Sequence, residues 1–109
     1  MNKLIAKGLI LETMRADRLR IAVVGPDTRR ALDQFVRVAH DVGLKFEARR
    51  AHGDARVHVR DTIIYFCDTQ YTSSHFRGAL FDLVYLYATD IAPDLLQGIM
   101  ARTKELVRA

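Results

Sequence analysis

Two short, continuous apolar runs limit what this chain can fold into. Residues 21–24 (Ile-Ala-Val-Val) are mostly β-branched and end abruptly at Gly25-Pro26, and residues 83–87 form a second apolar run. Runs of this length and composition are typical of strands buried on both faces, as in parallel sheets covered by helices. The sequence therefore favours an α/β fold with a partly parallel sheet.

Segments with helical spacing of apolar residues lie on both sides of the first run. Residues 2–16 form one such segment. A second follows Asp27 or Thr28, either of which can cap a helix, and it ends at Gly43. Glycine suits the left-handed position that commonly terminates a helix. We therefore expect a helix before and a helix after the first strand.

The last segment of the chain also has helical spacing. Pro93 fits the first turn of a helix, and apolar residues recur as far as Leu106 and Val107. Lys104 and Arg108 lie near the end, where the helix dipole favours positive charge. We expect one helix over this whole segment.

In the middle of the chain the apolar period changes to two, which is typical of strands. A turn at Arg60-Asp61 would join two strands of a hairpin and place Val57 and Val59 on one face. The expected elements are a short strand at residues 45–49, hairpin strands at 57–59 and 62–67, and a polar loop at 68–78.

The length of 109 residues suits one compact unit. We expect residues 1–109 to form a single α/β domain whose small, mixed sheet is flanked by helices and includes one β-hairpin. The apolar runs are far shorter than the roughly 20 residues that span a bilayer. Lys3, Lys7 and Glu12 interrupt the start of the chain, where a secretory signal would be apolar. The sequence thus predicts no membrane partner and a cytoplasmic location.

Residues with reactive side chains are scattered. The histidines His40, His52, His58 and His75 lack the spacing that places two metal ligands on one helix. Cys67 ends a predicted buried strand, which favours a core residue over a nucleophile, although a pairing with His75 stays open. We expect no catalytic residue, no metal ion and no cofactor.

Arginine is abundant in this chain. Seventeen Lys+Arg residues oppose 13 Asp+Glu, and thirteen of the bases are arginine, which suits bidentate phosphate contacts. Two interpretations are open: a solvated face, or a surface for nucleic acid. No aromatic residue that would stack on bases lies beside the clusters in sequence. The candidate residues are Arg15, Arg18, Arg29 and Arg30 around the first strand, and Arg49, Arg50, Arg56 and Arg60 around the hairpin.

Residues 76–78 (Phe-Arg-Gly) and 81–86 (Phe-Asp-Leu-Val-Tyr-Leu) carry a resemblance to a known family. Together they resemble the Walker B region of phage large terminase subunits and related helicase-like P-loop ATPases. Residues 2–16 resemble the helix after the phosphate loop, residues 20–26 the next strand, and residues 57–66 the family's hairpin. The resemblance covers about residues 2–105 and implies a trimmed P-loop ATPase-like fold.

The chain departs from this family at the positions that perform its chemistry. It has no G-x-x-x-x-G-K-[ST] loop to hold phosphates. Where the family has a magnesium-binding aspartate and a catalytic glutamate, this chain has Tyr87 and Ala88, which can neither hold a cation nor orient a water. The resemblance therefore implies the fold without the ATPase activity.

The leading hypothesis is a non-enzymatic viral (phage) protein in the host cytoplasm that acts by protein–protein interaction or self-assembly. Without the family's first core strand, residues 21–24 or their neighbour would have an unpaired edge, so a homo-oligomer is expected. A motor or a host protein is another candidate partner. The alternative is a basic accessory protein that binds nucleic acid through its arginine clusters.

Arg77 and Asp82 form a last candidate pair, with a structural or an interaction role. Arg77 precedes the strand at residues 83–87, and Asp82 or Asp90 can accept a charge-assisted fork from its guanidinium. A solvated loop arginine is the alternative interpretation.

Overall fold

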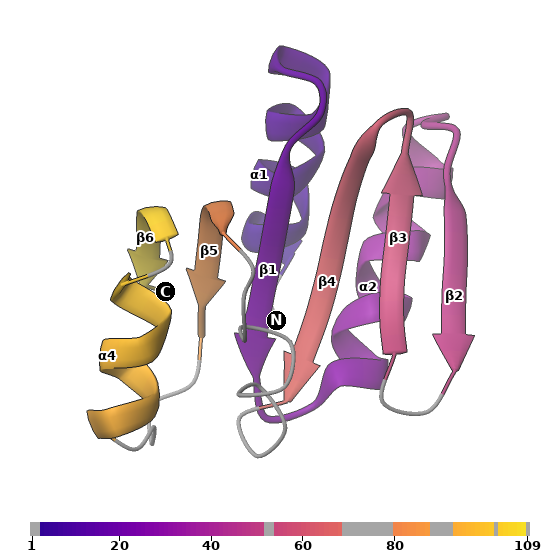
Figure 1. Ribbon diagram of the computed structural model, residues 1–109. Coiled ribbons are helices and arrows are strands. Elements are labelled where there is room, and N and C mark those ends of the chain that lie inside the picture. Colours follow the sequence, from indigo (N-terminus) through magenta and orange to yellow (C-terminus); the bar gives the residue numbers. More distant parts are fainter. Residues whose placement is uncertain (1–2, 52–53, 69–79, 88–92, 102, 109) are drawn as a thin grey trace.

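The computed structural model describes residues 3–51, 54–68, 80–87, 93–101 and 103–108. The strands are β1 (Arg20–Gly25), β2 (Glu47–Ala51), β3 (Asp54–Val59), β4 (Thr62–Asp68), β5 (Phe81–Leu86) and β6 (Thr103–Arg108). The helices are α1 (Lys3–Arg15), α2 (Thr28–Asp41) and α4 (Pro93–Ala101). The strands form one sheet in the order β2-β3-β4-β1-β5-β6 (Figure 1).

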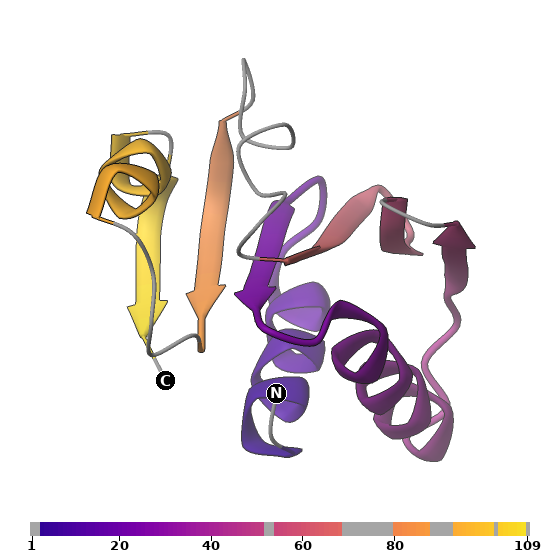
Figure 2. The same ribbon diagram turned by 90° about the horizontal axis from the view of Figure 1, so that it is seen from below.

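The sheet is mixed and partly parallel, as predicted. β1 pairs in parallel with β4 and β5, and β5 pairs in parallel with β6. β2, β3 and β4 pair with one another in antiparallel fashion. Viewed from below, α1 and α2 lie on one face of the sheet and α4 lies on the other (Figure 2). The predicted α/β fold with helices flanking the sheet is therefore confirmed.

β1 is buried on both faces, which explains its continuous apolar run. Ile21 and Val23 belong to the core under α1 and α2, while Ala22 and Val24 belong to the core that includes Ile99 of α4. Each of these four strand residues is at most 1% exposed. Burial on both faces removes the need for a polar residue at alternate positions.

The ends of α2 follow the chemistry expected from the sequence. The Asp27 side chain caps the helix by accepting a hydrogen bond from the Arg30 backbone N–H at 3.2 Å. Gly43 follows the helix with a φ of 75°, in the left-handed region that glycine tolerates at no steric cost. Both predicted helix signals are confirmed.

The hairpin of β3 and β4 turns at Arg60-Asp61, as predicted. Val57 and Val59 face the core under α2 and are almost fully buried. β2 begins and ends two residues later than expected. The predicted loop at 68–78 begins on Asp68, the last residue of β4, and its remainder lies outside the described residues.

The prediction of one helix from Pro93 to the end of the chain is wrong. α4 ends at Ala101, and residues 103–108 form β6, which pairs in parallel with β5. Leu106 and Val107 pack into the cores on opposite faces of the sheet, as neighbouring strand residues must. Pairing with a buried strand and burial on both faces outweigh the local helical pattern.

The predicted unpaired edge at residues 21–24 is also wrong. β1 is paired on both sides, by β4 and β5. Among the described residues the edges of the sheet are β2 and β6, which carry Arg49, Arg50, Lys104 and Glu105. Charged edge strands are typical of sheets protected against edge pairing. The structural reason for expecting a homo-oligomer is therefore absent, and the oligomer stays a prediction.

Candidate nucleic-acid interface

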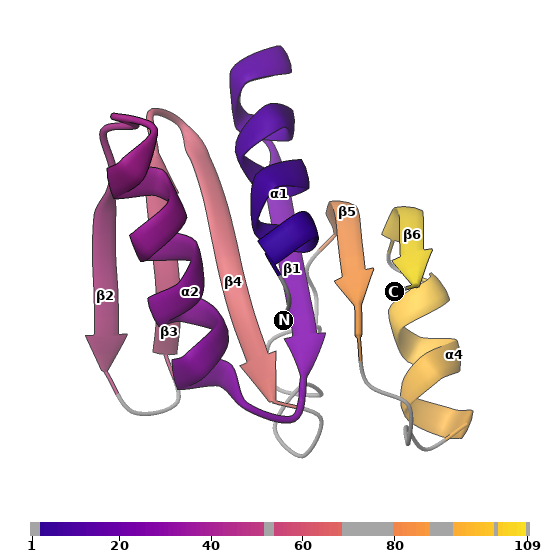
Figure 3. The same ribbon diagram turned by 180° about the vertical axis from the view of Figure 1, so that it is seen from behind.

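One face of β2, β3 and β4 has no described helix over it. Seen from behind, α1 lies over β1, and α2 lies over the three antiparallel strands (Figure 3). α4 lies on the opposite face beside β5 and β6 (Figures 1 and 2). The remaining surface, here called the open face, presents Glu47 and Arg49 of β2, Arg56 and His58 of β3, and Ile63 and Tyr65 of β4.

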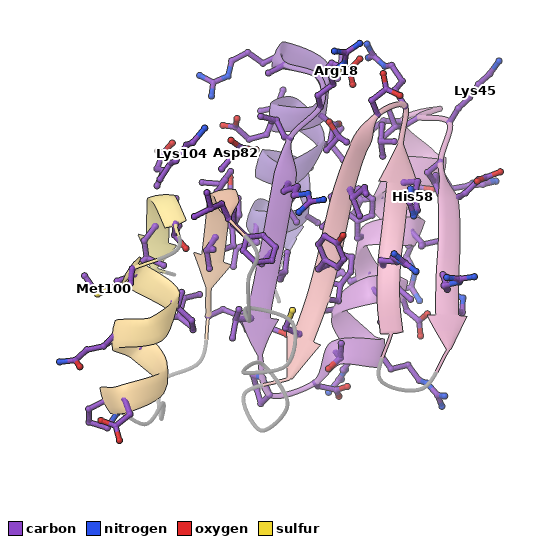
Figure 4. The ribbon with its side chains drawn as sticks, in the orientation of Figure 1. Arg18, Lys45, His58, Asp82, Met100 and Lys104 are labelled. Carbon is purple, nitrogen blue, oxygen red and sulfur yellow. The ribbon has the colours of Figure 1, made fainter. Side chains whose placement is uncertain are left out.

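Strand alternation places these side chains on the open face. Val57 and Val59 point into the core under α2, so Arg56 and His58 point to the other side of β3. His58 projects from the front of β3 in Figure 4. Residues directly opposite each other in paired strands share a face, which carries the assignment to β2 and β4.

The register arranges the open face in two rows. The first row is Arg49, Arg56 and Tyr65, because Arg49 lies opposite Arg56 and Arg56 lies opposite Tyr65. Directly opposed side chains have Cβ atoms about 4.5–5.5 Å apart, and like charges in that position are unfavourable. The two guanidinium groups therefore create a local positive potential that an anion would relieve.

The second row is Glu47, His58 and Ile63. Together with Ala48, the charged and polar members of both rows line an open hollow of about 600 Å³: Glu47, Arg49, Arg56 and His58. Two arginines against one glutamate leave the hollow with a net charge of 2 − 1 = +1 when His58 is neutral. Such a hollow suits a phosphate group better than a cation.

Tyr65 supplies the aromatic residue that the sequence analysis did not find beside the arginines. Its ring is partly buried and contacts Phe81 edge-on, with centroids 5.8 Å apart and an interplanar angle of 90°. The sequence contained a signal for this neighbour. In a hairpin that turns at Arg60-Asp61, Arg56 and Tyr65 must face each other.

The first predicted arginine cluster is divided between the two ends of the sheet. Arg15 and Arg18 precede β1, whereas Arg29 and Arg30 lie in the first turn of α2, beyond its opposite end. Arg15 forms an ion pair with Glu12 at 2.7 Å, and Arg18 lies 3.9 Å from Asp61. Figure 4 shows Arg18 at the upper end of the molecule. These four arginines do not form one surface.

The second predicted cluster is divided between the faces. Arg49 and Arg56 share the open face, but Arg50 points to the other side and pairs with Asp33 of α2. Arg60 lies in the turn at the end of the hairpin, with a positive φ of 54°. Of the eight candidate arginines, the structure brings Arg49 and Arg56 together with an aromatic ring.

Asp82 has partners other than the predicted Arg77, which lies outside the described residues together with Asp90. Its carboxylate accepts a hydrogen bond from the Arg20 backbone N–H at 2.9 Å and from Lys104 Nζ at 3.1 Å. Lys104 and Asp82 lie side by side in Figure 4. Partial burial acts to raise the pKa of Asp82, but these hydrogen bonds and the positive charges of Lys104 and Arg20 lower it below its ordinary value.

Replacing this carboxylate is expected to weaken the fold in a pH-dependent way. Asp82→Asn should lower the free energy of unfolding by about 1 kcal/mol near neutral pH. A lowered native pKa stabilises the fold above the unfolded value of about 4, and this contribution is lost as pH falls through the native pKa. Urea unfolding of both proteins should therefore converge in acid. Asp41→Asn, at an exposed position, is the matched control, and an equal pH-dependent loss there would contradict this role for Asp82.

Tyr87 occupies the carboxyl ends of β1 and β5, where ligands of open α/β sheets commonly bind. A Cβ atom added to Gly25 would lie 1.8 Å from Cζ of the Tyr87 ring. The Tyr87 backbone N–H donates to the Val24 carbonyl at 3.0 Å, and its hydroxyl lies 3.4 Å from the Asp27 carbonyl oxygen. The ring thus fills the space above Gly25. Ala88 lies outside the described residues.

Cys67 is a core residue, as the sequence favoured. It is 1% exposed, and burial raises the pKa of its thiol to about 12. The thiolate, which is the nucleophilic form, is therefore disfavoured at neutral pH. Within the described ranges, no three His, Cys, Asp or Glu side chains gather in a way that would hold a metal ion. No described helix is long and apolar enough to cross a membrane.

The sheet order, with parallel strands around β1 and an antiparallel hairpin at one side, defines the α/β fold class of P-loop-like ATPase domains. The fold is that of a large terminase from a thermophilic bacteriophage. One crystal form matches with a TM-score of 0.74 at 8% sequence identity, its ADP complex with 0.66 at 10%, and a further structure with 0.63 at 8%. The predicted resemblance in fold is confirmed.

These matches cover 95% of this chain but only 28–29% of the terminase, so the chain spans less than a third of that protein's length. At such low identity the likeness establishes the fold alone. No family model matches the chain, and no curated protein matches it in sequence.

Proposed function

We propose that this chain is a non-enzymatic module that binds nucleic acid through the open face. The observation that carries the proposal is the row of Arg49, Arg56 and Tyr65 across three neighbouring strands. Phosphates are recognised by arginine, and bases stack on aromatic rings, so this row combines both kinds of contact. The hollow beside it offers room for a phosphate group.

Two observations support a role without catalysis. The sequence lacks a phosphate loop, and the Tyr87 ring fills the space above Gly25 at the carboxyl ends of the central strands. A nucleotide placed there would have to displace the ring. The proposal includes a viral origin and action in the host cytoplasm, which the fold shared with a phage protein supports.

Nucleic-acid binding now ranks above self-assembly. The expected unpaired edge of β1 motivated self-assembly, and β1 is paired on both sides. The open face, by contrast, has a definite chemistry, with two arginines opposed across a strand pair. Interaction with a motor or a host protein has no comparable surface among the described residues.

Fluorescence anisotropy with a labelled oligonucleotide tests the proposal. Replacing Arg49 and Arg56 together by alanine should lower the affinity about tenfold at physiological salt. It should also reduce the slope of log affinity against log salt by about 1.4–1.8, because two phosphate contacts are lost. Arg37→Ala, which removes an exposed arginine of α2, is the control and should leave the affinity within about twofold.

The proposal has two separate points of failure. An affinity that the double substitution leaves unchanged would remove the open face as the binding surface. Magnesium-dependent ATP turnover by the purified chain would contradict the absence of catalysis. Light scattering with and without DNA separates binding from self-association, because a salt-insensitive oligomer without DNA would favour the self-assembly hypothesis.

A further inference from the structure

The centre of the open face is apolar and its margins are cationic. Ile63 and Tyr65 lie two residues apart on β4, so both point to the same face, and both are partly exposed. Arg56 lies beside Tyr65 on one side. On the other side, Arg20 at the start of β1 lies in register with Ile63 and is exposed.

The Tyr65 ring is held in place before any ligand arrives. Its edge-on contact with Phe81, a residue that is 2% exposed, fixes the ring from the side of the α4 core. Aromatic pairs of this geometry are favourable beyond the area that they bury. A fixed and partly exposed ring loses little conformational freedom when a planar group stacks on it.

The open face is too wide to enter a groove of duplex DNA. From β2 to β1 it spans three strand spacings, which is about 14 Å between backbones. The major groove, at about 12 Å, admits one helix or a two-stranded ribbon. Duplex bases are also paired and stacked, so a duplex would offer Tyr65 no free base and would contact only the arginines.

We infer that the open face binds single-stranded nucleic acid, with one base stacked on Tyr65 and adjoining phosphates held by Arg49 and Arg56. This inference rests on the proposed function and names its ligand class. DNA and RNA share the chemistry it needs, which is an unpaired base next to a phosphodiester backbone. Ile63 extends the apolar platform, and Arg20 provides a cation on its far side.

Anisotropy titrations of the full chain with three labelled probes test the inference. The probes are single-stranded DNA, single-stranded RNA of the same sequence, and the corresponding DNA duplex, all at one salt concentration. At least one single strand should bind about tenfold or more tightly than the duplex. Tyr65→Ala should lower single-strand affinity about 5- to 150-fold, the range for the loss of one base stack, and leave duplex affinity unchanged.

Two further variants keep the test decisive. Tyr65→Phe keeps the ring and should retain single-strand affinity within about twofold. Tyr65→Leu keeps apolar volume against Phe81 but has no π face, so it should behave like Tyr65→Ala and replaces that variant if the alanine protein does not fold. Thermal melts confirm that each variant is folded before titration.

The outcomes separate the inference from the proposed function. If the duplex binds as tightly as both single strands, or if Tyr65→Leu binds them like the native chain, the inference is overturned. Loss of binding on removal of Arg49 and Arg56 would then still support the proposed function. If none of the probes binds, both fail.

Discussion

Substituting Gly25 by alanine is expected to destabilise the protein by about 1–3 kcal/mol. The backbone at Gly25 is not in the left-handed region, so alanine is compatible with its conformation. The cost comes from Tyr87, because the new Cβ would lie 1.8 Å from Cζ and about 2 Å from both Cε atoms of the ring. The ring must leave its place above Gly25, and its hydroxyl must leave the Asp27 carbonyl.

A double-mutant cycle isolates this contact. In a Tyr87→Ala background the space above Gly25 is empty, so Gly25→Ala should then change the free energy of unfolding by less than about 0.5 kcal/mol. Gly98→Ala is the control. It lies in α4 with nothing within 4 Å of the added Cβ, and alanine should stabilise that helix by about 0.5–1 kcal/mol.

The same cycle bears on the proposed function. A cost of Gly25→Ala that is equal in both backgrounds would contradict the packing of the ring against the carboxyl end of β1. The argument that this end is closed to nucleotides would then lose its structural support. Urea unfolding of the four proteins of the cycle, followed by far-ultraviolet circular dichroism, gives the required free energies.

The elements that the sequence predicted correctly have local signals that agree with their tertiary environment. β1 is continuously apolar because both faces are buried, and α2 has Asp27 at its start and Gly43 beyond its end. In these segments periodicity, capping and burial all favour the same structure, so one sequence is enough to identify them.

β6 was missed because its local pattern and its tertiary environment disagree. Leu106 and Val107 continue the spacing of α4, and six residues with Lys104 and Glu105 at their centre show no strand alternation. The parallel register with β5 decides the structure, and a parallel partner many residues away leaves no signal in a local window. The position of Tyr87 over Gly25 depends on the same kind of distant pairing.

The candidate interface was predicted only in part for a related reason. Sequence proximity groups Arg49 with Arg50, but adjacent strand residues point to opposite faces, so Arg50 meets Asp33 while Arg49 meets Arg56. Counting outward from the predicted turn at Arg60-Asp61 pairs Arg56 with Tyr65. The composition alone does not contain this information.

Arg49→Glu is expected to raise stability and to lower nucleic-acid affinity. In the native chain two like charges are opposed at positions 49 and 56. A glutamate at position 49 would face the Arg56 guanidinium instead, and opposite charges in directly opposed positions are favourable by about 0.2–1 kcal/mol. A residue that is unfavourable for the fold and favourable for binding is the signature of a functional site.

The affinity of the Arg49→Glu protein should fall about 100-fold, because a phosphate contact is replaced by a repulsive charge. Arg50→Glu is the matched control. It changes the net charge by the same amount one residue further along β2, but on the other face, where it breaks the ion pair with Asp33. This control should lose some stability and keep most of its affinity. Equal losses of affinity in the two variants would mean that net charge, and not the open face, determines binding. Opposite signs in stability and unequal losses of affinity would locate the nucleic acid on the surface where Arg49, Arg56 and Tyr65 meet.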